Sequence, residues 1–395
     1  MRRLSFWILA AGVYGFVLSE LLGRGTYELA LILCGVGVGL TLLLDQGRRN
    51  VFEAPFWWLC GLSVALLVPG VLMAGYEAAA PAARELLSML LAVTAMLLLS
   101  ATGHLRASFV RHGTWLMLLF VAVHVGVLLA GGPKQPHLRT GWFSNIHYLA
   151  QFAAMLLPVI IYLLFRERGV FRAALMLALA ADFWLLLTTQ SRPGYVAVLL
   201  MSLSLIAFLR GRRRWFGLAG LLLAVAGLYA SRQFEMANRV DDFVTHFDQD
   251  ERWVIWRNTD VLQSASSALQ WVFGHGFGHF YATYKNTFDP PELWLFSFPH
   301  HYYKEILYSS GFMGVLLVLA GHVLWYGALI RAVRRSPNAQ GRQLGLMLLA
   351  ALTAEWGVTF FAIPFFSRHN LLPLSLLLGA TLVYLRSQDH GVRYG

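Results

Sequence analysis

The sequence has few charged residues. Asp, Glu, Lys and Arg make up 13% of its 395 residues, whereas hydrophobic residues make up 58%. Because soluble domains average about 25% charged residues, an ordinary soluble domain is excluded. The sequence also has only two cysteines, Cys34 and Cys60, and both fall within apolar runs. They provide no disulfide framework.

What the sequence has instead is long apolar runs, which recur from one end to the other. Each is close to the roughly 20 residues that a helix needs to cross a bilayer. Runs of this length satisfy their backbone groups in lipid as helices, not as barrel strands. Twelve runs are predicted, over residues 4–22, 27–44, 55–74, 85–102, 114–131, 145–165, 170–188, 194–209, 214–230, 303–329, 343–363 and 368–385. The expected fold is therefore an all-α polytopic membrane protein with about twelve transmembrane helices.

The net charge of +11 follows the membrane topology. More than half of the basic residues are arginines in the short loops that face one side if the N-terminus is cytoplasmic. This positive-inside pattern predicts that both termini are cytoplasmic. The basic excess then contacts lipid headgroups and is not a nucleic-acid surface. The first apolar run is longer than a cleavable signal core and lacks a clear cleavage site, so we expect a retained anchor helix.

One long segment, residues 231–302, contains no apolar run and falls on the outer side. It divides the chain into helices one to nine (1–230), an outer loop or cap (231–302) and helices ten to twelve (303–395). Residues 250–270 have roughly helical periodicity, which predicts a small helical cap. The expected buried positions of this helix are Val254, Val261, Leu262 and Leu269.

Five short motifs lie on the outer side in a characteristic order. They are TGWFSNIHYLAQF (140–152), TTQSRPGYVAVLL (188–200), ERWVIW (251–256), FGHGFGHF (273–280) and PHHYYKEILYSSGFMGVLL (299–317). In order and topological position they resemble motifs of the bacterial O-antigen ligase and polymerase family. Two departures are Pro193, where the family often has glycine directly after Ser-Arg, and His301, where the family usually has asparagine.

The resemblance implies a fold like that of the GT-C glycosyltransferases and a reaction in the bacterial inner membrane, on its periplasmic face. A glycan leaves an undecaprenyl-pyrophosphate carrier and joins a sugar hydroxyl. In the ligase branch the acceptor is lipid A-core. In the polymerase branch the acceptor is another carrier-linked glycan. The Arg192 loop and the segment 299–317 resemble the ligase branch more closely, so a ligase is expected and a polymerase is the alternative.

Arginines are the expected ligands of the donor pyrophosphate, which leaves with developing negative charge. A guanidinium donates paired hydrogen bonds to phosphate oxygens in a geometry that lysine does not match. Arg192 and Arg252 are the candidates, and Arg257 is a weaker one. On an ideal helix Arg257 lies about 140° around from Arg252, so both are not expected to point in one direction.

His300 is the candidate catalytic residue, because imidazole can accept the proton of the acceptor hydroxyl near neutral pH. The structural alternative is a histidine that caps a helix or anchors it at the interface. His301 and Tyr302 are expected to support the site or contact substrate. Asn145 and His147 fit equally a substrate contact and a helix start, since asparagine is a preferred N-cap residue.

No metal and no cofactor are expected. His275 and His279 are four residues apart, but the glycines between them argue against a helix, and no His-Glu-x-x-His pattern occurs. Arginines alone can hold a departing pyrophosphate. A lipid or glycan transporter is the alternative of another class. Transporters usually contain internal repeats and ionisable residues near span centres. Here no convincing repeat is found, and His124 and Asp182 are the main ionisable residues near span centres.

Overall fold

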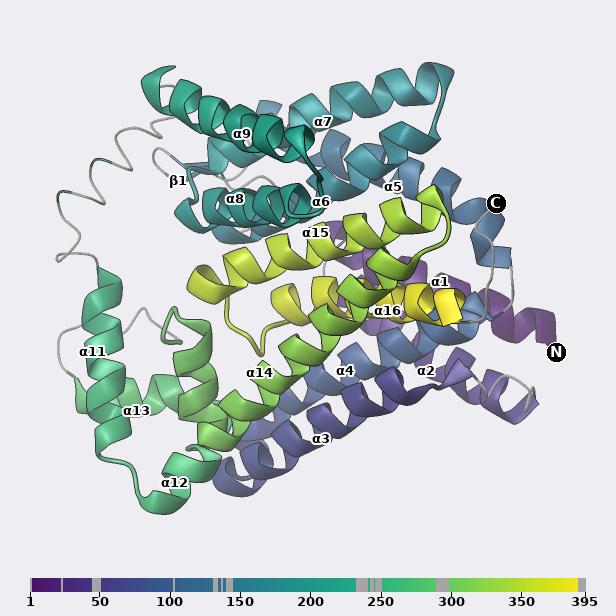
Figure 1. Cartoon of the computed structure of the whole chain (residues 1–395). Coiled ribbons are helices and arrows are strands. Elements are labelled where there is room, and N and C mark those ends of the chain that lie inside the picture. Colours follow the sequence, from purple (N-terminus) through teal and green to yellow (C-terminus); the bar gives the residue numbers. More distant parts are fainter. Residues whose placement is uncertain are drawn as a thin grey trace. The chain divides into compact units, whose positions relative to one another are not determined.

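The computed structural model describes residues 2–22, 24–44, 51–101, 104–130, 134–135, 138–139, 145–231, 241, 245, 251–288 and 298–389. Apart from connecting turns and loops, these residues form helices and one hairpin of two short strands, β1 (Lys134–Gln135) and β2 (Leu138–Arg139) (Figure 1). The first nine helices are α1 (Arg2–Leu22), α2 (Arg24–Leu44), α3 (Ala54–Ala74), α4 (Tyr76–Ser100), α5 (His104–Leu129), α6 (Ile146–Arg166), α7 (Gly169–Thr189), α8 (Arg192–Ile206) and α9 (Arg212–Ser231). The others are α11 (Glu251–Ser264), α12 (Ala268–Phe273), α13 (His279–Thr287), α14 (Tyr302–Arg335), α15 (Ala339–Ala362) and α16 (Arg368–Asp389).

A helix occupies each of the twelve apolar runs that the sequence predicts to be spans. Within the described ranges, nine helices are long and apolar enough to cross a membrane: α2 to α7 and α14 to α16. The apolar parts of α1 and α8 are shorter, and α9 is not among the nine. The all-helical, multi-pass membrane architecture is therefore confirmed.

Several exposed tryptophans lie near the beginnings of helices. Trp7 is in the second turn of α1, Trp57 and Trp58 are in the first turns of α3, and Trp215 is in the first turn of α9. Their exposed fractions are at least 60%. Amphipathic indole rings favour the headgroup level of a bilayer, so these positions fit an interfacial belt. In the predicted topology all of these helix starts face the cytoplasm.

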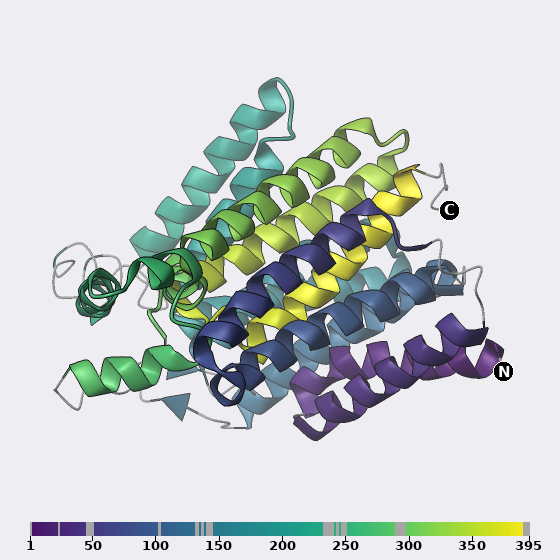
Figure 2. The ribbon, with the colours of Figure 1, turned by 90° about the horizontal axis from the view of Figure 1, so that it is seen from below.

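The chain forms two compact units. The first comprises residues 1–110, 256–345 and 364–395. In it α1 and α2 lie side by side, as Figure 2 shows, because glycines allow their backbones to approach closely. A methyl group on Gly12 would lie 2.8 Å from the backbone nitrogen of Cys34, and one on Gly37 would lie 2.9 Å from that of Leu9. Small residues at contacts between membrane helices permit this packing. The helices α2 and α16 both pack on α4.

The second unit comprises residues 111–255 and 346–363. Its most buried helix is α6, which packs against α7 and α8. The core of the unit is rich in alanine and contains Ala150, Ala153, Ala154, Leu157, Leu186, Ala197, Met201, Ala350, Ala354, Val358, Ala362 and Ile363. A methyl group on Gly357 of α15 would lie 2.6 Å from the Cα atom of Ala197 in α8. Close helix packing of this kind sets the positions of the ends of α6 and α8.

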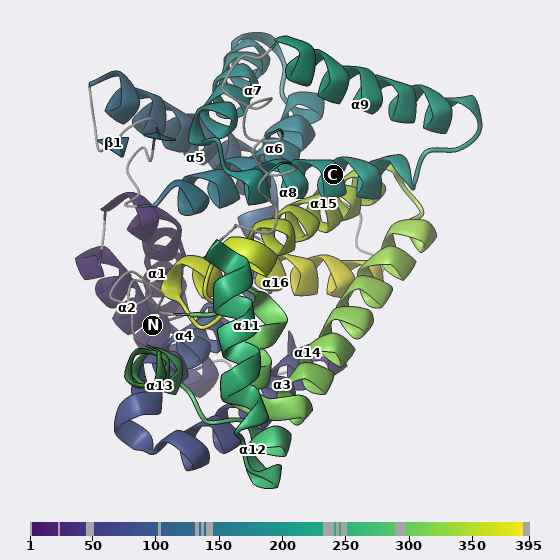
Figure 3. The ribbon, with the colours of Figure 1, turned by 90° about the vertical axis from the view of Figure 1, so that its left-hand side faces the viewer.

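The described part of the segment 231–302 is largely helical and contains α11, α12 and α13 (Figure 3), while its role as an outer cap stays a prediction. The region 250–270 is two helices and not one, because Ser267 and Gln270 form a capping box that begins α12. Three of the four expected buried positions are wrong. Only Leu262 is buried, whereas Val254, Val261 and Leu269 are exposed.

The reason for this error is the position of the buried stripe on α11. The stripe is made of Ile255, Thr259, Leu262 and Gln263, at helical spacing. Two of these residues are polar, so they give no signal in an apolar pattern. Residues 253–256 are all apolar, which leaves the orientation of the helix undetermined by the sequence.

Candidate functional site

The beginnings of α6 and α8 are joined by the side chains of His147, a predicted site residue, and Ser191. Asn145 caps α6, and its side-chain oxygen accepts a hydrogen bond from the backbone nitrogen of His147 at 2.7 Å. The Nδ1 atom of His147 lies 2.9 Å from the hydroxyl of Ser191, which caps α8 and accepts from the backbone nitrogen of Gly194 at 3.3 Å. The helix-start role is thus observed for Asn145, and a substrate contact remains a prediction. Residues 140–144 of the first motif lie outside the described residues.

The Ser-Arg-Pro-Gly sequence forms a tight turn between α7 and α8. Gln190 ends α7 in the left-handed conformation, with φ of 52°. Pro193 lies in the first turn of α8, where a missing N–H costs nothing. A methyl group on Gly194 would lie 2.9 Å from the Cβ atom of Ala150 in α6. The neighbours of Arg192 therefore set the backbone of the turn, and the half-buried Arg192 is the first residue of α8.

A buried polar pair lies deeper in the same unit, one turn along α6 from His147. Gln151 donates a hydrogen bond from Nε2 to the Glu355 carboxylate of α15 at 2.6 Å, and both residues are fully buried. Sequence analysis missed this pair. The signal that could have found it is an acidic residue inside an apolar run, since such residues are costly in a membrane and need a partner.

His300 lies directly before α14 in the first unit. Its φ is 52°, a left-handed conformation that is uncommon for residues other than glycine. The imidazole stacks on the ring of Phe298 with ring centroids 4.0 Å apart. Its side chain is half-buried. Strained backbone held by surrounding structure is a feature of many functional sites.

His301 is the N-cap residue of α14. Its Nδ1 atom accepts a hydrogen bond from the backbone nitrogen of Lys304 at 3.4 Å. The asparagine usual in the resembled family would fit this position, because an asparagine oxygen is among the best N-cap acceptors. The imidazole also makes an edge-to-face contact with Trp256 of α11. Lys304 pairs with Asp260, so two side-chain contacts join α11 to the first turn of α14.

Titration of His301 is expected to make the protein less stable at acidic pH. Burial, and secondarily Lys304, lowers the pKa of His301 from its ordinary value of 6.5. Below about pH 6.5 the unfolded chain therefore binds more protons than the folded one, and stability decreases as the pH falls. His301→Asn keeps a cap acceptor that does not titrate, so the pH dependence of the melting temperature between pH 7 and pH 5 should become shallower.

The control for this prediction is His275, a second histidine whose pKa is lowered, by burial and then by His279. Because His275 still titrates, the slope should decrease in His301→Asn but not vanish. An unchanged slope in that variant would contradict the assignment of His301. The measurement is thermal unfolding of the purified protein in detergent at several pH values.

Tyr302 and Glu305 lie inside the first turns of α14. Tyr302 is 2% exposed and packs edge-to-face on Phe365, with ring centroids 5.0 Å apart. The Glu305 carboxylate accepts a hydrogen bond from the backbone nitrogen of Phe365 at 2.9 Å. The side chain of Asn370 donates to the carbonyl oxygen of the same phenylalanine at 2.9 Å. Tyr302 is thus buried beneath the start of α14, its supporting role stays a prediction, and Glu305 is a buried carboxylate beside it that sequence analysis missed.

The glycine-rich motif FGHGFGHF packs against α14 and the end of α3. Gly274, Gly276 and Gly278 all have positive φ. The backbone nitrogen of His275 donates to the carbonyl oxygen of Tyr308 at 2.7 Å, and that of Gly276 donates to Ser309 at 3.0 Å. The Nε2 atom of the His275 ring also forms a hydrogen bond with the Ser266 hydroxyl, at 2.7 Å. The motif therefore forms a backbone junction between α12, α13 and α14.

Gly311 completes this junction at a kink inside α14. Its φ is 65°, and a Cβ atom there would overlap the carbonyl group of Val272. Gly311→Ala should lower the free energy of unfolding by about 2 kcal/mol or more, through backbone strain and steric overlap. The control is Gly61→Ala in α3, where no atom lies within 4 Å of the added carbon. It should change stability by at most about 1 kcal/mol, in the stabilising direction. Thermal unfolding in detergent measures both, and equal stability of the two variants would contradict the role of Gly311.

The α11 arginines differ in environment. Arg252, in the first turn of α11, is half-buried, whereas Arg257 is exposed. The expectation that the two side chains point in different directions agrees with this difference. Arg252 also lies four residues before Trp256, so the two residues lie on one face of α11.

The predicted site residues fall into two groups. Asn145, His147, Arg192 and Arg252 belong to the second unit, whereas Arg257, His300, His301 and Tyr302 belong to the first. All of them except Arg257, which lies in the middle of α11, are at or directly before helix starts, where backbone N–H groups and the helix dipole favour negative charge. Among the described residues, no group of three or more His, Cys, Asp or Glu side chains is arranged to hold a metal ion.

The central part of the chain is similar to a known protein family. Residues 173–319 match the family model described as O-antigen ligase. The match covers less than half of the chain, but it includes four of the five motif segments and the residues Arg192, Arg252 and His300. No curated protein matches the chain. The match supports a membrane enzyme of the O-antigen ligase or polymerase class. The resemblance predicted from the motifs is therefore confirmed over residues 173–319.

Proposed function

We propose that this protein is an O-antigen ligase, which transfers glycan from undecaprenyl-pyrophosphate to a sugar hydroxyl of lipid A-core. The observation that carries the proposal is the family match over residues 173–319. Within that range the three residues whose chemistry the reaction needs lie at or directly before helix starts: Arg192 at α8, Arg252 at α11 and His300 at α14.

The donor pyrophosphate is bound by arginines in this proposal. Arg192 is the first residue of α8 and Arg252 is in the first turn of α11, so each guanidinium is combined with a helix N-terminus that favours an anion. Bidentate hydrogen bonds from the two arginines stabilise the charge that develops as the carrier pyrophosphate leaves. Arg257 is exposed and contributes less, through long-range attraction. No divalent metal is required.

The acceptor is activated by His300. A nitrogen of its imidazole accepts the proton of the acceptor hydroxyl while the oxygen attacks the anomeric carbon. The bond from that carbon to the pyrophosphate oxygen breaks, and the carrier pyrophosphate leaves as the anion. A single displacement of this kind inverts the anomeric centre. The stack on Phe298 and the cap formed by His301 fix the position of the His300 ring and backbone.

The proposed membrane arrangement has twelve spans and a GT-C-like fold. The N- and C-termini are in the cytoplasm, the protein lies in the bacterial inner membrane, and the segment 231–302 with its helices α11 to α13 is periplasmic. Transmembrane helices one to nine precede this cap, over residues 1–230, and helices ten to twelve follow it, over residues 303–395. The correspondence of all twelve apolar runs with helices supports this arrangement.

A polymerase that extends carrier-linked glycan is the second candidate, because the matched family supports both activities. The test is transfer by the purified protein in nanodiscs. The protein receives undecaprenyl-pyrophosphate-linked glycan, with and without lipid A-core, in the presence of a chelator. Product on lipid A-core alone supports the ligase. Longer carrier-linked chains in the absence of lipid A-core support the polymerase. No product with either acceptor contradicts both and favours a transporter.

A further inference from the structure

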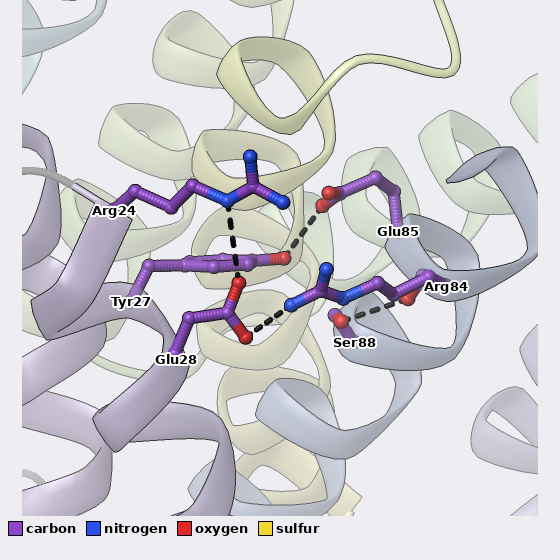
Figure 4. A network of polar contacts seen from close by, with 6 residues as sticks. All are labelled: Arg24, Tyr27, Glu28, Arg84, Glu85 and Ser88. Carbon is purple, nitrogen blue, oxygen red and sulfur yellow. Dashed lines mark hydrogen bonds and ion pairs between the residues drawn. The ribbon is translucent and has the colours of Figure 1, made fainter.

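A network of charged side chains joins α2, α4 and α16 in the first unit. Glu28 of α2 pairs with Arg24 of the same helix at 3.5 Å and with Arg84 of α4 (Figure 4). The Tyr27 hydroxyl donates to the Glu85 carboxylate at 2.6 Å. The Arg368 guanidinium lies over the Tyr27 ring, 5.4 Å from its centroid. We call these residues the outer arginine cluster: Arg24, Tyr27, Glu28, Arg84, Glu85 and Arg368.

The outer arginine cluster takes no part in the proposed transfer chemistry. Charged residues within membrane helices are costly and usually serve a function. The cluster contains three arginines and two glutamates, so it has one positive charge in excess. It is also accessible, since the side chains of Arg24 and Arg84 are 77% and 42% exposed. A purely structural ion pair needs neither the excess charge nor the exposure.

The arrangement of Arg24 and Arg84 suits a phosphate group. The two oxygens of Glu28 each contact one guanidinium, so a single carboxylate holds both arginines in place, as Figure 4 shows. Each guanidinium has five N–H donors, and contact with Glu28 uses few of them. A phosphomonoester has a charge of about −1.5 to −2 at pH 7 and three terminal oxygens. It can therefore bridge two guanidinium groups, whereas a singly charged phosphodiester is a weaker partner.

The cluster is connected to the helix that follows His300. Arg368 begins α16 three residues after Phe365, whose backbone nitrogen donates to Glu305 in α14. The helices α2, α4, α14 and α16 all begin on one side of the membrane in the proposed topology. A lipid whose phosphate lies at the cluster thus has its headgroup on the side where His300 lies.

We infer that the outer arginine cluster binds a phosphomonoester-bearing lipid through Arg24 and Arg84. We identify this lipid with the glycan acceptor, which rests on the proposed function. The protein holds the acceptor by its phosphate while its sugar reaches the site. Glu28 orders the two arginines in advance, which lowers the entropic cost of binding.

The test is titration of the full-length protein in detergent with a fluorescent phosphatidic acid, whose headgroup is a phosphomonoester. Arg24→Gln and Arg84→Gln should each lower the affinity about fivefold, as expected for one arginine at a membrane surface. Glu28→Gln loses the ordering of the two arginines but also removes a competing negative charge, so it should lower the affinity less than Arg84→Gln does. The matched control is Arg334→Gln, an exposed arginine in the last turn of α14. It should bind phosphatidic acid like the wild type.

Three results would overturn the inference. If Glu28→Gln lowers the affinity as much as Arg84→Gln does, the ion pair is only structural. If phosphatidylglycerol binds as tightly as phosphatidic acid, the surface responds to negative lipid charge and not to a phosphomonoester. If inorganic phosphate displaces the lipid completely at equal concentration, the site binds the free ion. Melting temperatures of Arg84→Gln and Glu28→Gln separate loss of binding from loss of fold.

The binding experiment needs no donor, so its outcome is independent of glycan transfer. In the transfer assay Arg84→Gln should raise the KM for the acceptor about fivefold and leave the KM for the donor unchanged. Arg84-dependent lipid binding without any transfer by the wild type would contradict the proposed function alone. Transfer without Arg84-dependent binding would contradict this inference alone.

Discussion

Replacing His300 with alanine should lower the rate of glycan transfer at least about 100-fold, because general-base catalysis contributes factors of about 100 to 10,000. The structure makes this substitution informative. The cap of α14 is supplied by His301 and the junction with α11 by Trp256 and Lys304, so these supports remain when the His300 ring is removed. The measurement is initial transfer rate at saturating donor and acceptor, with protein amount and melting temperature determined in parallel.

The positive φ of His300 provides a sharper version of this experiment. Glycine adopts a φ of 52° without strain, so His300→Gly should be no less stable than His300→Ala while it is equally inactive. The small cavity left by the ring is beside Phe298, and added imidazole should restore part of the rate if a base is what the variant lacks. The control is His112→Ala, which removes an exposed histidine of α5 and should retain wild-type transfer. Normal transfer by His300→Gly without imidazole would contradict the catalytic role.

The helices could be predicted from the sequence because each depends on a strong local signal. Apolar runs of about 20 residues have few alternatives in a membrane, and all twelve coincide with helices. Individual helix ends were also readable where a capping residue is present, as at Asn145. The break between α11 and α12 depends on the capping box of Ser267 and Gln270, a signal present in the sequence but weaker than the apolar periodicity around it.

The orientation of helices about their axes was harder to predict. On α11 the buried stripe includes Thr259 and Gln263, which no hydrophobic pattern identifies. The same difficulty explains why Glu305 and Glu355 were missed. Each is a buried carboxylate whose partner lies far along the chain, at Phe365 and Gln151. A partner 60 or 204 residues away is fixed by tertiary packing and leaves no spacing signal in the sequence.

The predicted site residues come from motifs, and the structure adds a reason for several residue types in those motifs. In FGHGFGHF the glycines are required by positive φ and by close contact with α14 and the end of α3, not by a ligand. In the segment 188–200, Ser191 caps α8 and Gly194 packs on Ala150. Once these structural needs are assigned, Arg192, Arg252 and His300 are the motif residues that we propose contribute the chemistry.

Arg192→Ala is expected to lower kcat/KM for the donor about 100- to 1,000-fold, the effect of removing one donor that stabilises developing charge. The turn itself should persist in this variant, because Ser191, Pro193 and Gly194 determine its backbone. Arg192→Lys keeps the charge but not the paired hydrogen bonds, so it should recover only part of the lost rate. The KM for the acceptor should remain unchanged in both variants, since the guanidinium acts on the leaving pyrophosphate.

The matched control for Arg192 is Arg212→Ala. Arg212 is also the first residue of its helix, α9, but lies on the cytoplasmic side in the proposed topology. It should transfer glycan at the wild-type rate. Because a helix start and an arginine are common to both positions, a loss confined to Arg192 can be attributed to the side of the membrane on which the pyrophosphate is held. Equal losses of activity in the two variants would instead indicate that both arginines serve general membrane association. Full activity of Arg192→Ala would show that Arg192 is not part of the donor site.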